Sequence, residues 1–175
     1  MPKCLAVDGQ ARVTLEGREE VRMEGISIRP CEAGDLPAVL DLLVQLSELA
    51  HGAPEFKPEV LSRLFAEMVQ APAFYDNRVA VCENQVAGFI SVIFYKTLFH
   101  TGGTALINDL VVSRAYRGRG IGQALVAKAR EEALARGMDE IEVSTENENL
   151  PARRLYQKCC FDQEYVLLGL EFERG

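Results

Sequence analysis

A chain of 175 residues is long enough for one globular domain with a sizeable core, or for one domain with a short appendage. Its hydrophobic fraction of 48% and its charged fraction of 26% exclude disordered and fibrous chains. The formal net charge of −7 and a pI near 5.0 argue against general nucleic-acid binding, which needs a basic face, so any anion must be bound by a local feature.

The first residues, MPKCLAVDGQ, lack the apolar core of a signal peptide, and the longest apolar run, from Phe89 to Tyr95, is too short to cross a bilayer. We therefore expect a soluble cytoplasmic protein with no membrane partner. The five cysteines contain no C-x-x-C pair. This spacing predicts reduced thiols, with neither a zinc site nor a disulfide framework, and we expect no bound metal.

Two alternating runs flank Asp8-Gly9, a dipeptide that favours the positive φ angles of a two-residue hairpin turn. The charged segment 17–25 follows them and is bounded by glycines, which suits a connector. We expect residues 1–25 to form an N-terminal extension, made of this hairpin and connector, and residues 26–175 to form the main domain.

Strand and helix patterns alternate along the main domain. Asp35 precedes a run with helical apolar spacing, as an N-cap would, and Pro37 lies in the first turn of that helix. Gly137 is placed as the C-cap of a later helix. In chain order the patterns predict a strand at 26–30, a helix at 36–50, a loop at 51–58, a helix at 59–70, two strands within 78–96 joined by a turn at 83–85, a strand at 105–112, a glycine loop and helix at 118–136, a strand at 140–145, a helix at 149–158 and a final strand at 165–173.

The stretch RGRGIG, residues 117–122, joins a predicted strand to a predicted helix, as phosphate-binding loops do. A Walker loop requires Lys-Ser or Lys-Thr after its glycines, and neither follows here. A dinucleotide fingerprint requires G-x-G-x-x-G, but after Gly118 and Gly120 the third position is Gln123, and the extra glycine is Gly122. The spacing therefore counts against a nucleotide-binding enzyme.

What remains is an alternation of these glycines with Arg117, Arg119 and Ile121, and Arg114 lies close by. Glycines let the backbone approach a bulky anion, and the free N–H groups at the start of a helix carry partial positive charge. Arginine side chains add charge-assisted donors. A tight turn alone would need only one or two glycines, so we expect a local site that holds a pyrophosphate largely by main chain.

Two motifs together resemble the GCN5-related N-acetyltransferase (GNAT) family. INDLVVSRAYRGRGIGQAL, residues 107–125, is similar to that family's central strand, acetyl-CoA pyrophosphate loop and helix, and NLPARRLYQKCCF, residues 149–161, is similar to its second signature. The resemblance implies an α/β fold with a mixed, mostly antiparallel sheet, splayed at the cofactor site and flanked by helices. It also implies an acetyl-CoA-dependent N-acetyltransferase that needs no metal.

The resemblance further implies roles for individual residues. Tyr156 matches the general acid that protonates the departing thiolate, and Asn149 would contact the cofactor. Main-chain groups would hydrogen-bond the pantetheine arm at the end of the central strand, and backbone amides of the glycine loop would hold the pyrophosphate. The residues implied to bind the cofactor are Leu110, Val111, Val112, Arg117, Gly118, Arg119, Gly120, Ile121, Gly122 and Asn149.

Each role has a simpler alternative, and two positions depart from the family pattern. Asn149 also suits a helix N-cap, and Tyr156 also suits a core position with its hydroxyl at the surface. Many relatives have Glu in the central strand, but here Asn108, which cannot take a proton, precedes Asp109. Cys160 replaces a glycine at a position where positive φ is expected.

The function that follows is acetyl transfer from acetyl-CoA to a primary amine of a small molecule or peptide, by direct attack of the neutral amine. An alkylamine is mostly protonated at neutral pH, so a base is needed, and the candidates are Asp109, Glu146 and His100. Segments 51–58, 59–70 and 96–103 are expected to line the acceptor site. The alternative is a non-catalytic acyl-CoA-binding regulatory module of the same fold, which Asn108 favours and Tyr156 disfavours. We expect no nucleic-acid partner and keep a homodimer open.

Overall fold

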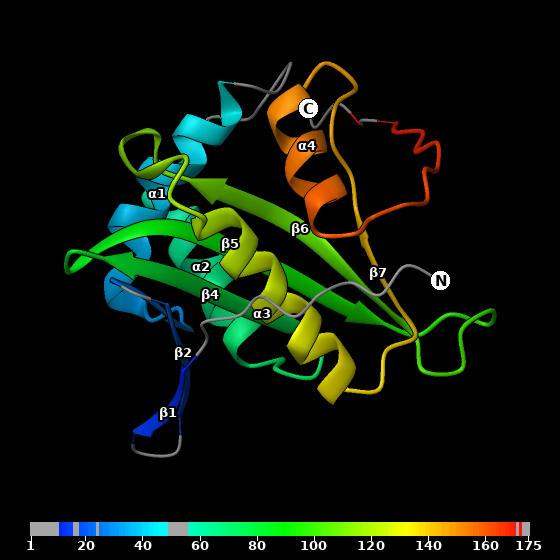
Figure 1. Cartoon of the computed structure of the whole chain (residues 1–175), viewed down its shortest axis with the longest axis horizontal. Coiled ribbons are helices and arrows are strands. Elements are labelled where there is room, and N and C mark those ends of the chain that lie inside the picture. The colour runs from blue at the N-terminus through cyan, green and yellow to red at the C-terminus, as the bar shows by residue number, and fades with distance from the viewer. Residues whose placement is uncertain (1–10, 16–17, 24, 49–55, 171, 173–175) are drawn as a thin grey trace.

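One mixed β-sheet runs through the computed structural model, which describes residues 11–15, 18–23, 25–48, 56–170 and 172 (Figure 1). In the described residues the sheet has seven strands that lie side by side in chain order. Every neighbouring pair is antiparallel except the last, which is parallel. The strands are β1 (Ala11–Leu15), β2 (Arg18–Met23), β3 (Ile26–Pro30), β4 (Tyr75–Cys82), β5 (Gln85–Tyr95), β6 (Thr104–Val112) and β7 (Glu140–Val143).

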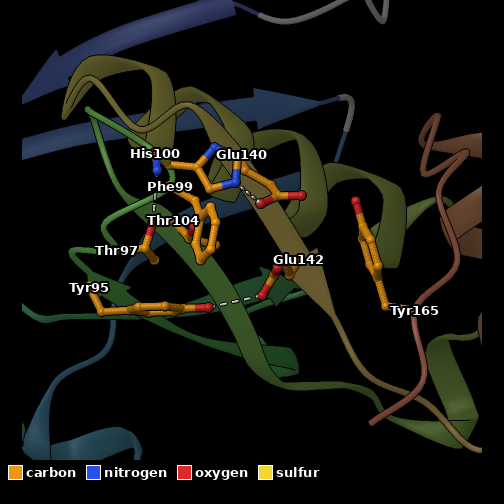
Figure 2. A pocket seen from close by; sticks show the side chains of 8 residues that line it. All are labelled: Tyr95, Thr97, Phe99, His100, Thr104, Glu140, Glu142 and Tyr165. Atoms are coloured by element: carbon orange, nitrogen blue, oxygen red, sulfur yellow. Dashed lines mark hydrogen bonds and ion pairs between the residues drawn. The ribbon is translucent and has the colours of Figure 1, made fainter.

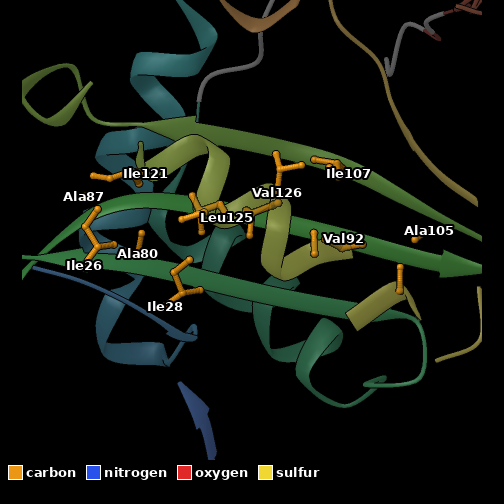
Figure 3. Packing of buried hydrophobic residues seen from close by; sticks show 14 of the residues in the cluster. Ile26, Ile28, Ala80, Ala87, Val92, Ala105, Ile107, Ile121, Leu125 and Val126 are labelled. Carbon is orange, nitrogen blue, oxygen red and sulfur yellow. The ribbon is translucent and has the colours of Figure 1, made fainter. Parts of the chain in front are cut away.

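Helices cover both faces of this sheet. α1 (Leu36–Ser47) and α2 (Pro58–Val69) pack on one face, against Val79, Phe89 and Val111. α3 (Ile121–Ala135) packs on the other, where Ile121, Leu125 and Val126 lie over the middle strands (Figure 3). α4 (Leu150–Lys158) packs beside the start of α3, and two short 3₁₀ helices lie at Ala33–Asp35 and Arg114–Tyr116. The predicted fold class, a mostly antiparallel mixed sheet flanked by helices, is confirmed.

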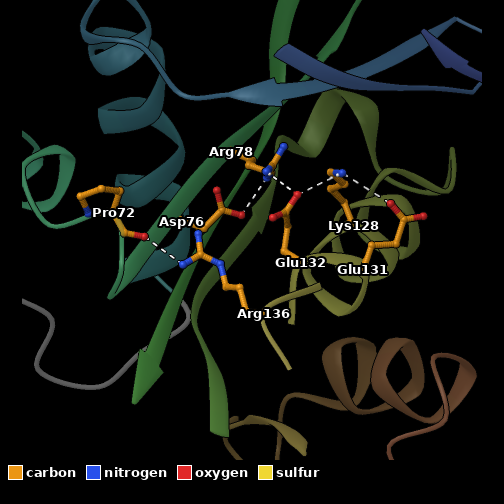
Figure 4. A network of polar contacts seen from close by, with 7 residues as sticks. All are labelled: Pro72, Asp76, Arg78, Lys128, Glu131, Glu132 and Arg136. Atoms are coloured by element: carbon orange, nitrogen blue, oxygen red, sulfur yellow. Dashed lines mark hydrogen bonds and ion pairs between the residues drawn. The ribbon is translucent and has the colours of Figure 1, made fainter. Parts of the chain in front are cut away.

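A network of buried charges fastens the second half of α3 to the sheet (Figure 4). Arg78 of β4 bonds Asp76 and Glu132, each at 2.7 Å, and its side chain is 8% exposed. Lys128 of α3 lies 3.1 Å from the same Glu132. Arg136, one residue past the helix, lies over the ring of Phe94 at 4.1 Å. Because buried ion pairs stabilise only when well paired, this geometry fixes the position of the helix on the strands.

The N-terminal part differs from the sequence prediction. The predicted turn at Asp8-Gly9 lies outside the described residues. The connector predicted over 17–25 is wrong at 18–23, because these residues form β2, which pairs with both β1 and β3. A charged composition does not exclude a strand near the edge of a sheet, where the backbone ladder supplies the stabilising contacts. The division into an extension and a domain at residue 26 stays a prediction.

The C-terminal strand predicted over 165–173 is also wrong for the residues that the structure describes there, 165–170 and 172, which belong to no strand. Val166 and Leu168 are each 88% exposed. An apolar run predicts a strand only when a neighbouring strand and a core receive it, and sequence pattern reports neither. All the other predicted helices and strands of the main domain are present, with ends that differ from the prediction by at most three residues.

The cysteines correct one expectation. Cys31, Cys82 and Cys159 are free thiols, as predicted, whereas Cys160 is disulfide-bonded, so the prediction of reduced thiols is wrong there. Disulfide pairing cannot be deduced from the spacing of cysteines alone. None of the described helices has the length and hydropathy needed to span a bilayer. The described residues also contain no group of three or more His, Cys, Asp or Glu side chains suited to a metal ion.

Candidate active site

β6 and β7 separate at one end, and this splay defines the candidate site (Figure 1). Their parallel ladder runs from Thr104 opposite Glu140 to Ile107 opposite Val143 and then stops. β6 continues for residues 108–112 with β5 as its neighbour on one side. Its other side has no strand partner in the described part of the chain, so the main chain there can accept a ligand as an added strand would be accepted. The predicted pantetheine-binding residues lie here, and they are Leu110, Val111 and Val112.

The glycine loop follows this part of β6, and its three glycines are required for two different structural reasons. Gly118 and Gly120 have φ angles of 79° and 81°, a region that favours glycine, and Gly120 is the N-cap of α3. Gly122 lies inside α3, where a Cβ atom would come within 3.0 Å of Leu155 in α4. Gly122 therefore allows α3 and α4 to pack closely. The positive φ angles of Gly118 and Gly120 shape the backbone at the start of α3.

The loop arginines are occupied by local partners. Arg117 donates through Nε to the carbonyl of Val112 at 3.1 Å. Arg119 pairs with Glu83 at 2.8 Å, and Arg114 pairs with Glu48. The predicted anion site therefore relies on main-chain N–H groups and the N-terminus of a 15-residue helix, with the side chain of Ile121 buried in the core.

Tyr156 lies in α4, and Asn149 is the N-cap of that helix. Tyr156 is 8% exposed, and its ring meets that of Phe161 edge-on at 5.5 Å. Burial raises the pKa of its hydroxyl to about 12, so Tyr156 is a neutral phenol that can donate a proton. The side chain of Asn149 accepts a hydrogen bond from the backbone of Ala152 at 3.3 Å. The capping role of Asn149 is confirmed, and its contact with a cofactor stays a prediction.

The three candidate bases lie in different places. Asp109 lies on the splayed part of β6, is half-buried, and accepts a hydrogen bond from Asn108 at 2.8 Å. Burial raises the pKa of Asp109, and the bond from Asn108 opposes this effect. His100 lies near the other end of β6 and pairs with Glu140 at 3.0 Å. Glu146 is exposed in the segment after β7. Only Asp109 is both part of the splay and partly shielded from water.

A cavity of about 250 Å³ lies at the paired end of β6 and β7 (Figure 2). Thr97, Phe99 and His100 line it, all from the segment that we expected to line the acceptor site. The Tyr95 hydroxyl donates to Glu142 at 2.9 Å within this cavity. The sequence did not predict the remaining lining residues, which are Tyr95, Thr104, Glu140, Glu142 and Tyr165. The alternation in EIEV could have indicated two of them, because it places Glu140 and Glu142 on one face of β7.

Known proteins resemble this chain in both sequence and fold. It is 30% identical over 155 residues to a glucosamine 6-phosphate N-acetyltransferase 1 of Oryza sativa subsp. japonica, covering 85% of this chain and 88% of that protein. It is 34% identical over 153 residues to an aminoalkylphosphonate N-acetyltransferase of Salmonella typhimurium, covering 87% and 95%. The crystal structure of glucosamine-6-phosphate N-acetyltransferase from Arabidopsis thaliana has the same fold, with a TM-score of 0.73 at 23% identity, and covers 86% of this chain and 100% of that one.

A family model described as the acetyltransferase (GNAT) family matches residues 41–161, well over half of the chain. This range includes the splay, the glycine loop and all of α4. The expected family, and with it the expected enzyme class of N-acetyltransferase, are confirmed. The splayed sheet, the glycine-opened helix and these matches lead to one assignment: the chain belongs to the acetyltransferase (GNAT) family.

Proposed function

We propose that the protein transfers an acetyl group from acetyl-CoA to a primary amine of a small molecule or peptide. The observation that carries this proposal is the end of the β6–β7 ladder at Ile107, directly ahead of the glycine loop and the start of α3. An extended chain ending in a pyrophosphate matches that sequence of open strand edge and helix N-terminus. A Cβ atom on Gly118 would meet nothing within 4 Å, so the loop leaves room for a bulky anion.

The residues that hold acetyl-CoA in this proposal follow its length. Main-chain groups of Leu110, Val111 and Val112 bond the pantetheine arm along the open edge. The backbone amides of residues 117–122 hold the pyrophosphate, and Asn149 contacts the cofactor from the N-cap of α4. Arg117 already bonds the Val112 carbonyl, so this contact has to open or shift if that oxygen is to bind the arm.

Two side chains manage protons. Asp109 accepts a proton from the acceptor's ammonium group, because its raised pKa makes it a better base near neutrality than an exposed carboxylate. Tyr156 donates a proton toward the departing thiolate, as a neutral phenol can. The amine thereby attacks in its neutral form, and the products are an amide and a free thiol. The thioester supplied by acetyl-CoA is what makes the acyl carbon reactive.

The acceptor is a small amine in this proposal. Two relatives are named for amines that also carry a phosphate or phosphonate group, glucosamine 6-phosphate and aminoalkylphosphonate. The cavity beside Glu140 and Glu142 lies at the other end of β6 from Asp109, so its carboxylates could attract only a second cationic group of the acceptor. Amines with and without a phosphorus oxyanion therefore belong in the first acceptor panel.

The remaining proposals concern the protein's surroundings. We infer a cytoplasmic location and no membrane partner. We also infer no nucleic-acid partner, which the net charge of −7 supports. A homodimer is proposed as the oligomeric state. Light scattering after size-exclusion chromatography tests it, and a mass near 19.4 kDa at all concentrations would contradict it.

Thermal unfolding tests cofactor binding first. Acetyl-CoA at about a hundred times its dissociation constant should stabilise the fold by about 2.7 kcal/mol, and NAD and ATP should stabilise it much less. Mass spectrometry of an amine panel then tests turnover. Binding without any acetylated product would favour the second candidate, a regulatory acyl-CoA-binding module, whose supporting observation is Asn108 at a position where relatives often have Glu.

A further inference from the structure

A β-bulge in β6 brings two neighbouring side chains to one face of the sheet. Asp109 pairs with Ser91 of β5, whereas Ile107 pairs with Val92, so Asn108 has no partner of its own and is the extra residue. Neighbouring side chains in a regular strand point to opposite faces. Here Asn108 instead donates through Nδ2 to the Oδ2 atom of Asp109 at 2.8 Å. The bulge is what makes this contact between sequence neighbours geometrically accessible.

The register shows which face this is. Val111, Phe89 and Val79 lie in neighbouring strands and pack under α1 and α2. Two residues along each strand, the apolar row gives way to a polar row on the same face, which consists of Asp109, Ser91 and Asn77.

This polar row is costly for the fold. Ser91 is 3% exposed, and the Oδ1 atom of Asn77 is buried without a hydrogen-bond partner among the described residues. Buried polar groups lower stability unless they are hydrogen-bonded, so apolar residues would serve the core better here. A polar row that ends at the splay is the arrangement expected where polar chemistry takes place at the open end.

We propose that Asn108 is a positioning residue, whose amide holds the Asp109 carboxylate by one oxygen and leaves the other for the acceptor's ammonium group. This inference rests on the proposed function, in which Asp109 is the base. Oδ2 receives the Asn108 amide, and no other hydrogen bond or ion pair to Asp109 is formed within the described residues. Asn108 is thereby a part of the catalytic arrangement and not a sign of lost activity.

The protonation of Asp109 gives a readout that a purely structural role of Asn108 would not move. Burial raises the pKa of Asp109, and the amide of Asn108 lowers it. Within the described residues no charged group acts on this carboxylate, and its cross-strand neighbour Ser91 does not titrate near neutrality. Removing the amide should therefore raise the pKa of Asp109.

The experiment follows the Asp109 carboxyl carbon by NMR during a pH titration of the ligand-free protein, with Asp109→Asn used to assign the signal. In Asn108→Ala the carboxyl group should titrate at higher pH than in wild type. In Asn108→Asp, which is nearly isosteric, it should move at least as far, because an added carboxylate repels the second charge. Asn108→Gln keeps a donor and should lie closer to wild type. An unmoved Asp109 titration in both Ala and Asp variants would overturn the proposal.

Steady-state kinetics separates this inference from the function beneath it. The acidic limb of the kcat/KM profile should move to higher pH in Asn108→Ala. At pH values below that limb, kcat/KM should fall by about tenfold, which is less than the 10² to 10⁴ expected when a base is removed. Full activity of Asp109→Asn would contradict the role of Asp109 as the base and leave the NMR result standing. Loss of activity in Asp109→Asn with an unmoved NMR titration in Asn108→Ala would contradict only the positioning role.

Discussion

The two ends of strand β6 differ in their strand partners. Residues 104–107 lie between β5 and β7, and their surroundings include the cavity with Glu140 and Glu142. Residues 108–112 keep β5, lose β7 and gain a bulge. A complete ladder leaves no main-chain group for a ligand, whereas an incomplete one does. The cofactor contacts that we propose therefore lie at the open end, and side-chain recognition is the function available to the paired end.

The strongest test of the open end is Tyr156→Phe. If Tyr156 protonates the leaving thiolate, kcat should fall by about 10² to 10⁴, or about 3 to 5 kcal/mol of transition-state stabilisation, while acetyl-CoA affinity changes little. Steady-state kinetics together with a direct CoA titration measure both. Tyr116→Phe is a matched control, since Tyr116 lies near the glycine loop and its hydroxyl bonds Gln85 at 3.2 Å. A kcat within twofold of wild type for both variants would make Tyr156 a packing residue.

The glycine loop can be tested by comparing the two ends of α3. Gly120 and Gly137 have positive φ angles of 81° and 69°, so valine at either position strains the backbone, by at least about 1 to 2 kcal/mol. Only Gly120→Val should also lose acetyl-CoA affinity, by at least about a hundredfold, or 2.7 kcal/mol, because its side chain enters the proposed phosphate site. Calorimetric titration and chemical unfolding of both variants provide the comparison. Equal affinities in the two folded variants would reduce the loop to a turn.

The paired end should behave in the opposite way. Tyr95→Phe removes the hydroxyl that bonds Glu142, and we expect a loss of about 1 kcal/mol in unfolding free energy with no change in acetyl-CoA affinity. Burial and then Glu142 raise the pKa of Tyr95, so the folded state favours the protonated phenol. The stability that the Tyr95 hydroxyl contributes is therefore fully present below the pKa of tyrosine in the unfolded chain, near 10. It is lost as the pH rises through the raised pKa of Tyr95 in the folded state. Urea unfolding at neutral and alkaline pH measures this.

Tyr165→Phe is the control for that prediction, because Tyr165 lines the same cavity but is 73% exposed. Its stability should stay within about 0.5 kcal/mol of wild type. Weakened acetyl-CoA binding in Tyr95→Phe would show that the two ends of β6 are coupled, against the comparison drawn above.

The smallest expected effect concerns the end of α4. Cys160 has a φ angle of 70°, which confirms the positive φ expected there. Cys160→Gly and Cys160→Ala both lack the thiol, so the disulfide is absent from both, and their difference isolates the Cβ atom. We expect the Gly variant to be more stable by up to about 1 kcal/mol. If urea midpoints place the Ala variant higher, the entropy that glycine adds to the unfolded chain outweighs the relief at φ.

Local patterns predicted most of the fold. The helices after Asp35 and Gly120 have the apolar spacing that defines helices in any context, and both are present. The capping predicted for Asp35 is not seen, because its carboxylate accepts from Arg29 and from the backbone of Glu32 and makes no cap hydrogen bond to α1. The predictions that failed concern residues 18–23 and 165–170, and both depend on a partner strand. Residues 18–23 have such a partner, and residues 165–170 have none among the described residues. Pairing partners are a property of the folded chain, and apolar alternation does not report them.

At the candidate site the sequence predicted where the glycine loop and the last helix lie, but not which side chains contact one another. The glycine spacing predicted the position of the loop. It could not predict that Arg119 pairs with Glu83 and Arg114 with Glu48, because these partners lie far away in sequence. The bond between Asn108 and Asp109 depends on a bulge that the register with Ser91 reveals. Asn108, which looked like a missing base in the sequence, is a hydrogen-bond donor to Asp109, the base that we propose.

The buried charges that fasten α3 have a consequence for how the protein responds to ionic strength. Arg78 and its partners Asp76 and Glu132 are at most 16% exposed, so dissolved salt screens them little. The pair between Arg119 and Glu83, with side chains 49% and 65% exposed, is open to screening. A rise in ionic strength should therefore weaken the pair between Arg119 and Glu83, while α3 keeps its position on the sheet. The ion pairs that hold α3 below the proposed anion site should therefore resist salt, whereas the ion pair of Arg119 beside that site should not.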